Sequence, residues 1–322
     1  MAPMHRTFHR NPEFWMRLAW RFCGKGILTR ARIFAPDLIF AHHTCVNGWL
    51  ALQLSRALSV PFVCQDHLQG EVLLCDRLPK RCSMFERIGD GASAMLVVSR
   101  KMAADLGRIL PRAEVGILYN GAQTVAAPQG LVPAGRRPKT IFGVGMLTEA
   151  KGFEYVIRAW ADVVRRFPDA KLRIAGDGPE RARLSALRDS LGLAESVALL
   201  GYMSHEQVLL EMAQSRAFVL AAWNEAFGVV FTEAMGAGCP VVWGAECGVA
   251  DVLRDGENGY AVAPRDPAAI ANALHRLLES DDLASTVGAA NRSLYGECFT
   301  WDAVAAQAMA IFRKALEEKG MF

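Results

Sequence analysis

Two glutamates eight positions apart are the residues best suited to bind a ligand with several hydroxyls. Glu225 falls in a loop after an apolar run, and Glu233 falls in the helix that Gly228 opens. At about 1.5 Å of rise per helical residue, the two carboxylates lie at most about 12 Å apart, comparable with the span from a sugar to the ribose of its nucleotide. Carboxylates accept hydrogen bonds from paired hydroxyls, so Glu225 suits a sugar and Glu233 a ribose. Backbone N–H groups near Phe227 and Gly228 remain free for a phosphate.

A second group of candidate residues follows the apolar run 140–144, where glycines and a lysine precede a helix. Gly145 and Gly152 let backbone N–H groups approach an anion, and a helix N-terminus adds its dipole. Lys151 supplies a positive charge beside that terminus. The segment therefore predicts a pyrophosphate site, with a tight turn and a solvated lysine as the alternative. A nicotinamide dinucleotide is disfavoured, because Thr148 stands where G-x-G-x-x-G requires its third glycine.

These residues need a scaffold, and short apolar runs that alternate with helical periodicity indicate an α/β protein with parallel sheets. A loose segment rich in proline, glycine and arginine separates two sets of strands. We predict a short Rossmann-like domain at residues 1–127, a linker at 128–138 and a second Rossmann-like domain at 139–322. The strand candidates are 37–41, 61–64, 94–98 and 115–119 in the first domain, and 140–144, 171–175, 197–200, 217–221, 240–243 and 260–262 in the second.

Composition and charge exclude several classes of protein. A formal net charge of +3 is too small to indicate a nucleic-acid partner by itself. No apolar run has the length of a membrane span and no signal peptide follows Met1, so we expect a cytoplasmic protein. The eight cysteines are scattered without a C-x-x-C pair, so neither a zinc site nor a disulfide framework is indicated, and we expect reduced, mostly buried thiols.

The first 32 residues are basic and aromatic and allow two interpretations. Their charged side chains are Arg6, Arg10, Arg17, Arg21, Lys25, Arg30 and Arg32, against the single acid Glu13. Phe14, Leu18 and Phe22 recur at helical spacing, which fits either packing on a sheet or peripheral contact with an anionic membrane on its cytoplasmic face. We favour packing, because an α/β domain needs a helix before the strand at 37–41.

Together these motifs resemble the retaining glycosyltransferases of family 4, which have the GT-B fold. Residues 225–233 are similar to that family's E-x7-E element, and residues 145–152 to its G-R-L-x-x-x-K-G phosphate loop. Four shorter segments also match: 119–121 its N-G, 175–179 its G-x-G-P turn, 200–202 its F-L-G strand end and 255–259 its D-G-x-x-G turn. The resemblance covers nearly the whole chain and implies two Rossmann-like domains that face a cleft.

The resemblance also implies a reaction, namely transfer of a hexose with retention from a UDP- or GDP-sugar, without a required metal. The acceptor would be a glycan, a polysaccharide precursor or a lipid-linked glycan, held by the first domain. In this family that domain supplies a histidine near the donor sugar, and His67 is the matching candidate, ahead of His42 and His43. The catalytic candidates are thus His67 and Glu225. The donor-binding candidates are Gly145, Lys151, Gly152, Glu225, Ala226, Phe227, Gly228, Val229 and Glu233.

Three departures from the family pattern keep an alternative open. Met146 stands where the family has an arginine on the diphosphate, and Ala226 replaces a glycine. The strand-helix units that open the family's first domain are not found in residues 1–36, so its sheet would be incomplete. We expect a truncated start, a partner that covers the gap or an unstable first half. The alternative function is therefore a nucleotide-binding pseudo-glycosyltransferase or partner subunit with impaired activity.

Overall fold

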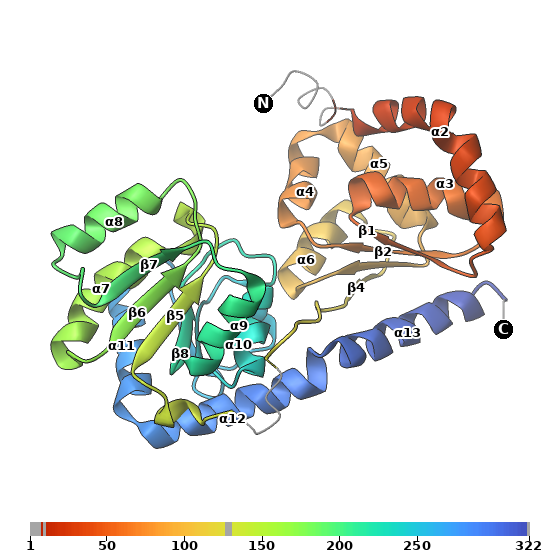
Figure 1. The fold of residues 1–322 in the computed structure, drawn as a ribbon. Coiled ribbons are helices and arrows are strands. Elements are labelled where there is room, and N and C mark those ends of the chain that lie inside the picture. Colours follow the sequence, from red (N-terminus) through yellow and green to blue (C-terminus); the bar gives the residue numbers. More distant parts are fainter. Residues whose placement is uncertain (1–7, 9–10, 126–130, 321–322) are drawn as a thin grey trace. The chain divides into compact units, whose positions relative to one another are not determined.

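The computed structural model describes Phe8 and residues 11–125 and 131–320, which form two α/β units (Figure 1). One unit comprises the chain up to Tyr119 together with the chain from Val304, and the other comprises Asn120–Ala303. Each unit has one sheet in which all strands are parallel. The α/β class and the two Rossmann-like units that the sequence predicts are thus confirmed.

The first unit contains a four-stranded sheet in the order β1-β2-β3-β4. Its strands are β1 (Ile39–His42), β2 (Phe62–Asp66), β3 (Ala94–Val97) and β4 (Val115–Ile117). Its helices are α2 (Pro12–Phe34), a π-helix (Thr44–Gly48), α3 (Trp49–Leu58), α4 (Gln69–Leu73), a 3-10 turn (Leu74–Arg77), α5 (Pro79–Gly91) and α6 (Arg100–Ile109). β2 is buried at all five positions, as expected for a strand covered on both faces.

The second unit contains a six-stranded sheet in the order β10-β9-β8-β5-β6-β7. Its strands are β5 (Thr140–Val144), β6 (Lys171–Ala175), β7 (Val197–Gly201), β8 (Ala217–Leu220), β9 (Val241–Gly244) and β10 (Gly259–Val262). Its α-helices are α7 (Phe153–Arg166), α8 (Arg181–Ser190), α9 (His205–Gln214), α10 (Val229–Gly236), α11 (Pro267–Glu279) and α12 (Asp281–Cys298), with 3-10 turns at Ala134–Arg136, Glu149–Lys151 and Gly248–Asp251. The ten predicted strands agree with these bounds to within two residues at each end.

The last helix, α13 (Trp301–Glu317), completes the core of the first unit. Its residues Val304, Ala308 and Ala315 cluster with Val63, Leu96 and Leu118 of the first sheet region. The sequence assigned this helix to the second domain because it follows that domain in the chain. In the structure its apolar stripe buries itself against the first unit instead, and sequence order gives no indication of this packing.

The predicted linker 128–138 lies partly outside the described residues, at positions 128–130. Its remaining part is packed into the second unit. Arg137 is buried and donates from its guanidinium to the carbonyl oxygens of Met212 (3.3 Å), Ser215 (3.0 Å) and Ala237 (2.8 Å). A buried cation surrounded by backbone carbonyls ties this segment to the unit that follows it.

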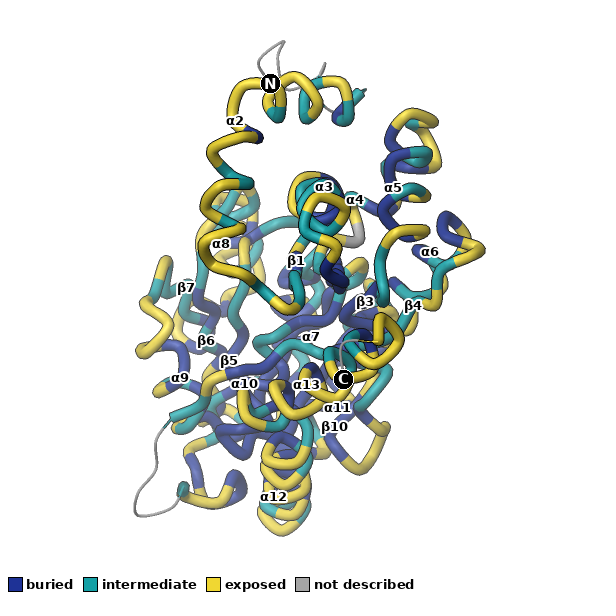
Figure 2. Tube along the Cα trace, turned by 90° about the vertical axis from the view of Figure 1, so that its right-hand side faces the viewer, coloured by how far each residue is buried: buried dark blue, intermediate teal, exposed yellow. Residues whose placement is uncertain are grey.

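Helix α2 lies against helices of its own unit but leaves most of its length exposed (Figure 2). Trp20 meets Trp49 of α3 edge to face at 6.1 Å, and Glu13 pairs with Arg87 of α5. Phe22, Ile33 and Phe34 are all largely exposed. The favoured interpretation, packing on the sheet, thus describes α2 poorly. Arg6 and Arg10 lie outside the described residues. Among the residues described, no helix combines the length and the apolar character that a bilayer crossing requires.

All eight cysteines lie within the described ranges and are free thiols, five of them buried. Burial raises the pKa of Cys64 and Cys247 to about 12. A thiol that stays protonated is a poor nucleophile and a poor metal ligand. The five buried cysteines therefore serve as small apolar side chains in the two cores.

Candidate functional site

The candidate residues of the second unit follow two neighbouring central strands, β5 and β8. The chain runs outward from β5 through β6 to β7 and then returns to β8, so the strand order reverses between β5 and β8. In open parallel sheets, ligands bind at the carboxyl ends of the strands on either side of such a reversal. The loops after the two strands are joined directly, since the Trp223 N–H donates to the Ala150 carbonyl at 3.0 Å.

The loop after β5 turns tightly into helix α7 at Gly152. This residue has a φ of +71°, and a Cβ built on it would lie 2.2 Å from the carbonyl oxygen of Ala221. Only glycine fits both the left-handed backbone and the close approach of Ala221, which follows β8. No side chain caps α7, so the first N–H groups of this helix are available to an anion.

The turn after β6 supports the loop after β5 from the other side. Leu147 donates its N–H to the Asp177 carbonyl at 2.9 Å, and a Cβ on Gly176 would lie 2.0 Å from the Gly145 carbonyl oxygen. The two glycine-rich segments therefore pack backbone against backbone. Met146 sits at the tip of the loop with 64% of its surface exposed and offers no hydrogen-bond donor to a phosphate.

Lys151 and Glu225 form an ion pair between the two loops. The side chains are 26% and 20% exposed, so the pair is partly shielded yet open to a ligand. The lysine ammonium has three donors, and the carboxylate has lone pairs on both oxygens, so neither group is saturated by this contact. The sequence proposed separate partners for the two residues and did not anticipate that they meet each other.

The second loop leads into α10 through Gly228, which has a φ of +90° and precedes the helix without a side-chain cap. Phe227 is buried beneath this turn, while Ala226 and Val229 are partly exposed beside it. The Gly248 N–H donates to the Glu225 carbonyl at 3.0 Å and fixes the loop from the segment after β9. The start of α10 therefore presents backbone N–H groups beside the Lys151–Glu225 pair.

Glu233 lies further along α10 and is nearly inaccessible, with 7% of its surface exposed. Its Oε1 is 2.7 Å from Nε2 of His205, the first residue of α9. Burial raises the pKa of Glu233, and the hydrogen bond and charge interaction with His205 act in the opposite direction. No sequence pattern indicates His205 as a partner, because 28 positions and two loops separate it from Glu233.

The first unit gathers three histidines at the carboxyl ends of β1 and β2. His42 Nδ1 lies 2.8 Å from His67 Nε2, and the rings of His43 and His67 are 5.4 Å apart. The buried Asp66 accepts from the N–H groups of Thr44 (3.2 Å) and Leu68 (3.0 Å), which fixes the loops that carry the histidines. Burial, and then the neighbouring His43, lowers the pKa of His42.

The sequence ranked His67 ahead of His42 and His43, whereas the structure places all three in one cluster. A neutral His42 can exchange one hydrogen bond with His67 and so select its tautomer. Among the described residues, no group of three or more histidine, cysteine or acidic side chains is arranged to hold a metal ion.

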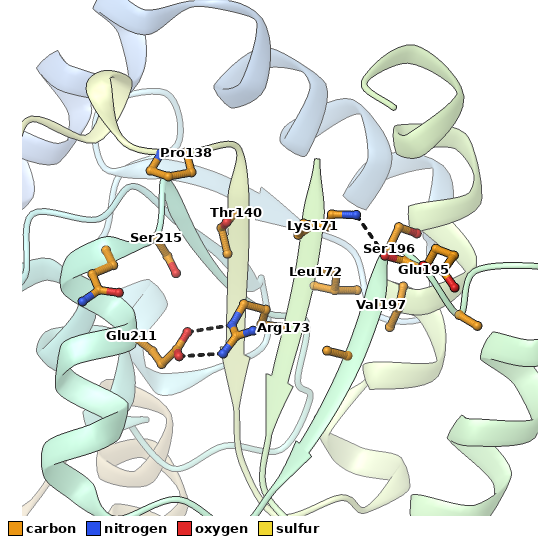
Figure 3. A pocket seen from close by; sticks show the side chains of 13 residues that line it. Pro138, Thr140, Lys171, Leu172, Arg173, Glu195, Ser196, Val197, Glu211 and Ser215 are labelled. Carbon is orange, nitrogen blue, oxygen red and sulfur yellow. Dashed lines mark hydrogen bonds and ion pairs between the residues drawn. The ribbon is translucent and has the colours of Figure 1, made fainter. Parts of the chain in front are cut away.

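A cavity of about 460 Å³ lies at the opposite end of the second sheet (Figure 3). It is lined by the amino ends of β5, β6 and β7, with Thr140, Lys171 and Val197 among its residues. Arg173 and Glu211 form a two-bond ion pair across it, at 2.7 and 2.9 Å. Arg173 and Glu211 thus neutralise each other, and the cavity is separate from the residues around Lys151.

Comparison with known proteins places the chain in a family. The model of the family described as "Glycosyl transferases group 1" matches residues 132–294, and that described as "Glycosyltransferase Family 4" matches residues 3–125. An uncharacterized glycosyltransferase of Methanocaldococcus jannaschii is 34% identical over 297 residues, which cover 86% of this chain and 75% of that protein.

Solved structures show the same fold at lower sequence identity. Sucrose-phosphate synthase from Thermosynechococcus elongatus has a TM-score of 0.75 and 24% identity, over 99% of this chain and 81% of that one. HepE of Anabaena, solved in complex with UDP, has a TM-score of 0.73 and 19% identity, over 90% of this chain and 81% of that one. The chain therefore belongs to the group 1 glycosyltransferases of family 4 and has two Rossmann-like domains of the GT-B type.

Proposed function

We propose that this glycosyltransferase moves a hexose from a nucleoside diphosphate sugar to a glycan, polysaccharide precursor or lipid-linked acceptor, with retention at the anomeric carbon. The observation that carries the proposal is the meeting of Lys151 and Glu225 at the strand-order reversal, beside two helix starts without side-chain caps. Such a place combines a cation, a carboxylate and free N–H groups, as a diphosphate linked to a sugar requires.

Each candidate residue has a defined role in this proposal. Lys151 and the N-terminus of α7 at Gly152 bind the diphosphate, with Gly145 allowing close approach of the loop. Glu225 accepts hydrogen bonds from the sugar hydroxyls, while Glu233 accepts from the ribose.

The turn from Ala226 to Val229 completes the donor site around the diphosphate. Phe227 and Gly228 belong to this turn, which holds the start of α10 in place and offers its N–H groups. In the first domain, His67 positions the transferred sugar, with His42 selecting its tautomer.

In the reaction, the bond between the anomeric carbon and the β-phosphate oxygen breaks and a bond to the acceptor oxygen forms. Negative charge collects on the departing diphosphate, and positive charge develops on the sugar ring. In this proposal Lys151 and the N–H groups at the helix start stabilise the first charge without a metal, and the carboxylate of Glu225 stabilises the second. The acceptor proton leaves with the diphosphate product or with solvent.

A panel of nucleotides tests the proposal. Stabilisation of the native state by UDP, GDP and their sugars is measured by thermal shift, followed by donor hydrolysis and sugar transfer with the same preparation. HepE, with its bound UDP, makes a UDP-sugar the first donor to try. Binding together with turnover supports the proposal. Binding without any turnover favours the pseudo-glycosyltransferase, and no binding of any nucleotide contradicts both.

Glu233→Gln should change stability and nucleotide affinity in opposite directions. Since burial raises the pKa of Glu233, the folded state holds this proton more tightly than the unfolded state does, and the ionised carboxyl reduces stability as pH rises through the folded pKa. At pH 8 we expect Glu233→Gln to raise Tm by roughly 1–3 °C, an effect that disappears near pH 4. The same variant should bind nucleotide less tightly, because a neutral amide accepts more weakly than a carboxylate.

Scanning calorimetry at pH 4 and pH 8, with and without the nucleotide, measures both effects. A lower Tm for the variant at pH 8 would show that Glu233 stabilises the fold when ionised. Unchanged nucleotide affinity would remove its role at the ribose.

Peripheral contact of α2 with an anionic membrane is a further part of the proposal. The exposed face of this helix combines Phe22 and Ile33 with Arg21 and Lys25, which suits lipid headgroups near a lipid-linked acceptor. We expect Arg21→Glu/Lys25→Glu to reduce cosedimentation with phosphatidylserine vesicles, at about 1 kcal/mol per lost basic charge. The matched control is Arg165→Glu/Arg166→Glu on α7, and equal vesicle binding by both double variants would argue against this contact.

A further inference from the structure

His205 contacts the one candidate carboxylate that is deeply buried. Its Nε2 lies 2.7 Å from Oε1 of Glu233, while half of the histidine side chain, 51%, remains exposed. An ionised carboxylate only accepts hydrogen bonds, so the ring nitrogen donates the proton in this contact. One lone pair of Oε1 is thereby used, and both lone pairs of Oε2 remain as acceptors.

The backbone of His205 is fixed by the helix start that carries it. Ser204 caps α9, with its Oγ accepting from the Gln207 N–H at 3.3 Å and its own N–H donating to Gln207 Oε1 at 2.9 Å. This reciprocal pair is a capping box, which holds the first turn of a helix in one geometry. His205 is the first residue inside that turn, so its ring projects from a rigid position.

His205 compensates for the cost of burying the ionised carboxylate of Glu233. Tyr295 of α12 is a second titratable group that interacts with the carboxylate. Burial, and then the charge of Glu233, raises the pKa of Tyr295, so the phenol stays neutral. Its hydroxyl donates to the Ala122 carbonyl at 2.9 Å. The hydrogen bond from His205 thus favours the ionised form of Glu233, which burial disfavours.

We propose that His205 is a positioning residue for the donor's ribose: it holds Oε1 of Glu233 and orients Oε2, whose two lone pairs accept from the two ribose hydroxyls. This inference rests on the proposed role of Glu233 at the ribose. It assigns His205 no contact with the reacting atoms. The expected consequence is that His205 controls how strongly the enzyme prefers a ribonucleotide to its 2′-deoxy form.

Three substitutions separate the hydrogen bond from other effects of the ring. In His205→Gln the amide nitrogen lies at about the distance of Nε2 and keeps a donor in that place. In His205→Asn the amide is too short to reach Glu233, although the side chain stays polar. His205→Ala removes the side chain. Circular dichroism and Tm establish that each variant is folded before its affinity is measured.

The measurement is the affinity, by titration calorimetry, for UDP or GDP, whichever the wild-type protein binds more tightly, and for its 2′-deoxy analogue. We expect His205→Asn and His205→Ala to lose roughly 2- to 10-fold in affinity for the ribonucleotide, the range of a single hydrogen bond, with a smaller loss for the 2′-deoxy form, which keeps one of the two hydroxyls. His205→Gln should keep most of the wild-type preference. In a Glu233→Ala background, His205→Asn should have no further effect.

The outcomes distinguish this inference from the function on which it rests. If the wild-type protein binds neither UDP nor GDP, the proposed donor site is wrong and the inference is wrong with it. If the wild-type protein prefers the ribonucleotide and His205→Asn keeps the same preference, the donor site stands and the role of His205 is refuted. An equal loss of affinity for both nucleotides also refutes it, because that pattern indicates a general structural effect.

Discussion

Lys151→Ala should lower kcat/KM for sugar transfer by about 10²- to 10³-fold, the range found when one preorganised stabiliser of transition-state charge is removed. The lysine is a cation at the strand-order reversal and pairs with Glu225, and Met146 offers no charge in its stead. Its loss also leaves Glu225 with a partly shielded and unpaired negative charge beside the expected diphosphate. Both effects raise the free energy of the transition state, in which negative charge collects on the leaving diphosphate.

The matched control for Lys151 is Lys139→Ala. Lys139 also pairs with an acid, Asp169, at 3.2 Å, but it lies just before β5, at the other end of the same strand. Steady-state kinetics of both variants, measured with the same donor and acceptor, shows whether the loss of kcat/KM is specific to Lys151. Transfer by Lys151→Ala within threefold of the wild-type rate would mean that the diphosphate binds elsewhere.

Gly152→Ala should reduce both stability and nucleotide binding. The residue adopts a φ of +71°, and an added Cβ would lie 2.2 Å from the Ala221 carbonyl oxygen, so the methyl group meets backbone that cannot rotate away. The left-handed backbone alone costs an alanine about 1–2 kcal/mol. The clash adds to that cost, and relieving it must move either β8 or the start of α7. We therefore expect a fall in Tm together with a loss of nucleotide affinity.

Gly192→Ala separates backbone strain from the clash. Gly192 has a nearly equal φ of +69°, yet an added Cβ there would meet no heavy atom within 4 Å. Thermal denaturation of the two variants should show a modest loss for Gly192→Ala and a larger one for Gly152→Ala. Equal losses would mean that the contact with Ala221 relaxes without consequence.

The sequence predicted the elements of this fold well because most of its signals are local. Parallel strands that are covered on both faces appear as apolar runs, and glycines with positive φ mark the turns that follow β5 and precede α10. The proximity of Lys151 and Glu225 could also be predicted, because the carboxyl ends of neighbouring parallel strands lie at one edge of the sheet. Their direct pairing was not, because it depends on side-chain reach across two loops.

Features that depend on distant packing could not be predicted. His205 meets Glu233 only through the return of the chain from β7 to β8, and a histidine at a helix start has no distinctive pattern. Helix α13 belongs to the first unit because an apolar face of that unit would otherwise stay uncovered, and the sequence does not show which face that is. The prediction that α2 packs on the sheet failed for the same reason. The sequence places Arg137 in a linker because arginine, glycine and proline gather there, although its guanidinium donates to three backbone carbonyls of the second unit.

The contribution of α13 to the core around Val63, Leu96 and Leu118 bears on how the chain acquires its structure during synthesis. The first unit is discontinuous, since its sheet ends near Tyr119 and its last core residues come from Val304 onward. A ribosome releases that final stretch only after the whole second unit has emerged, so the earlier segment must wait with part of its apolar surface uncovered. An expressed fragment that stops at Tyr119 would keep this apolar surface exposed. Adding α13 as a separate peptide is the direct way to cover it.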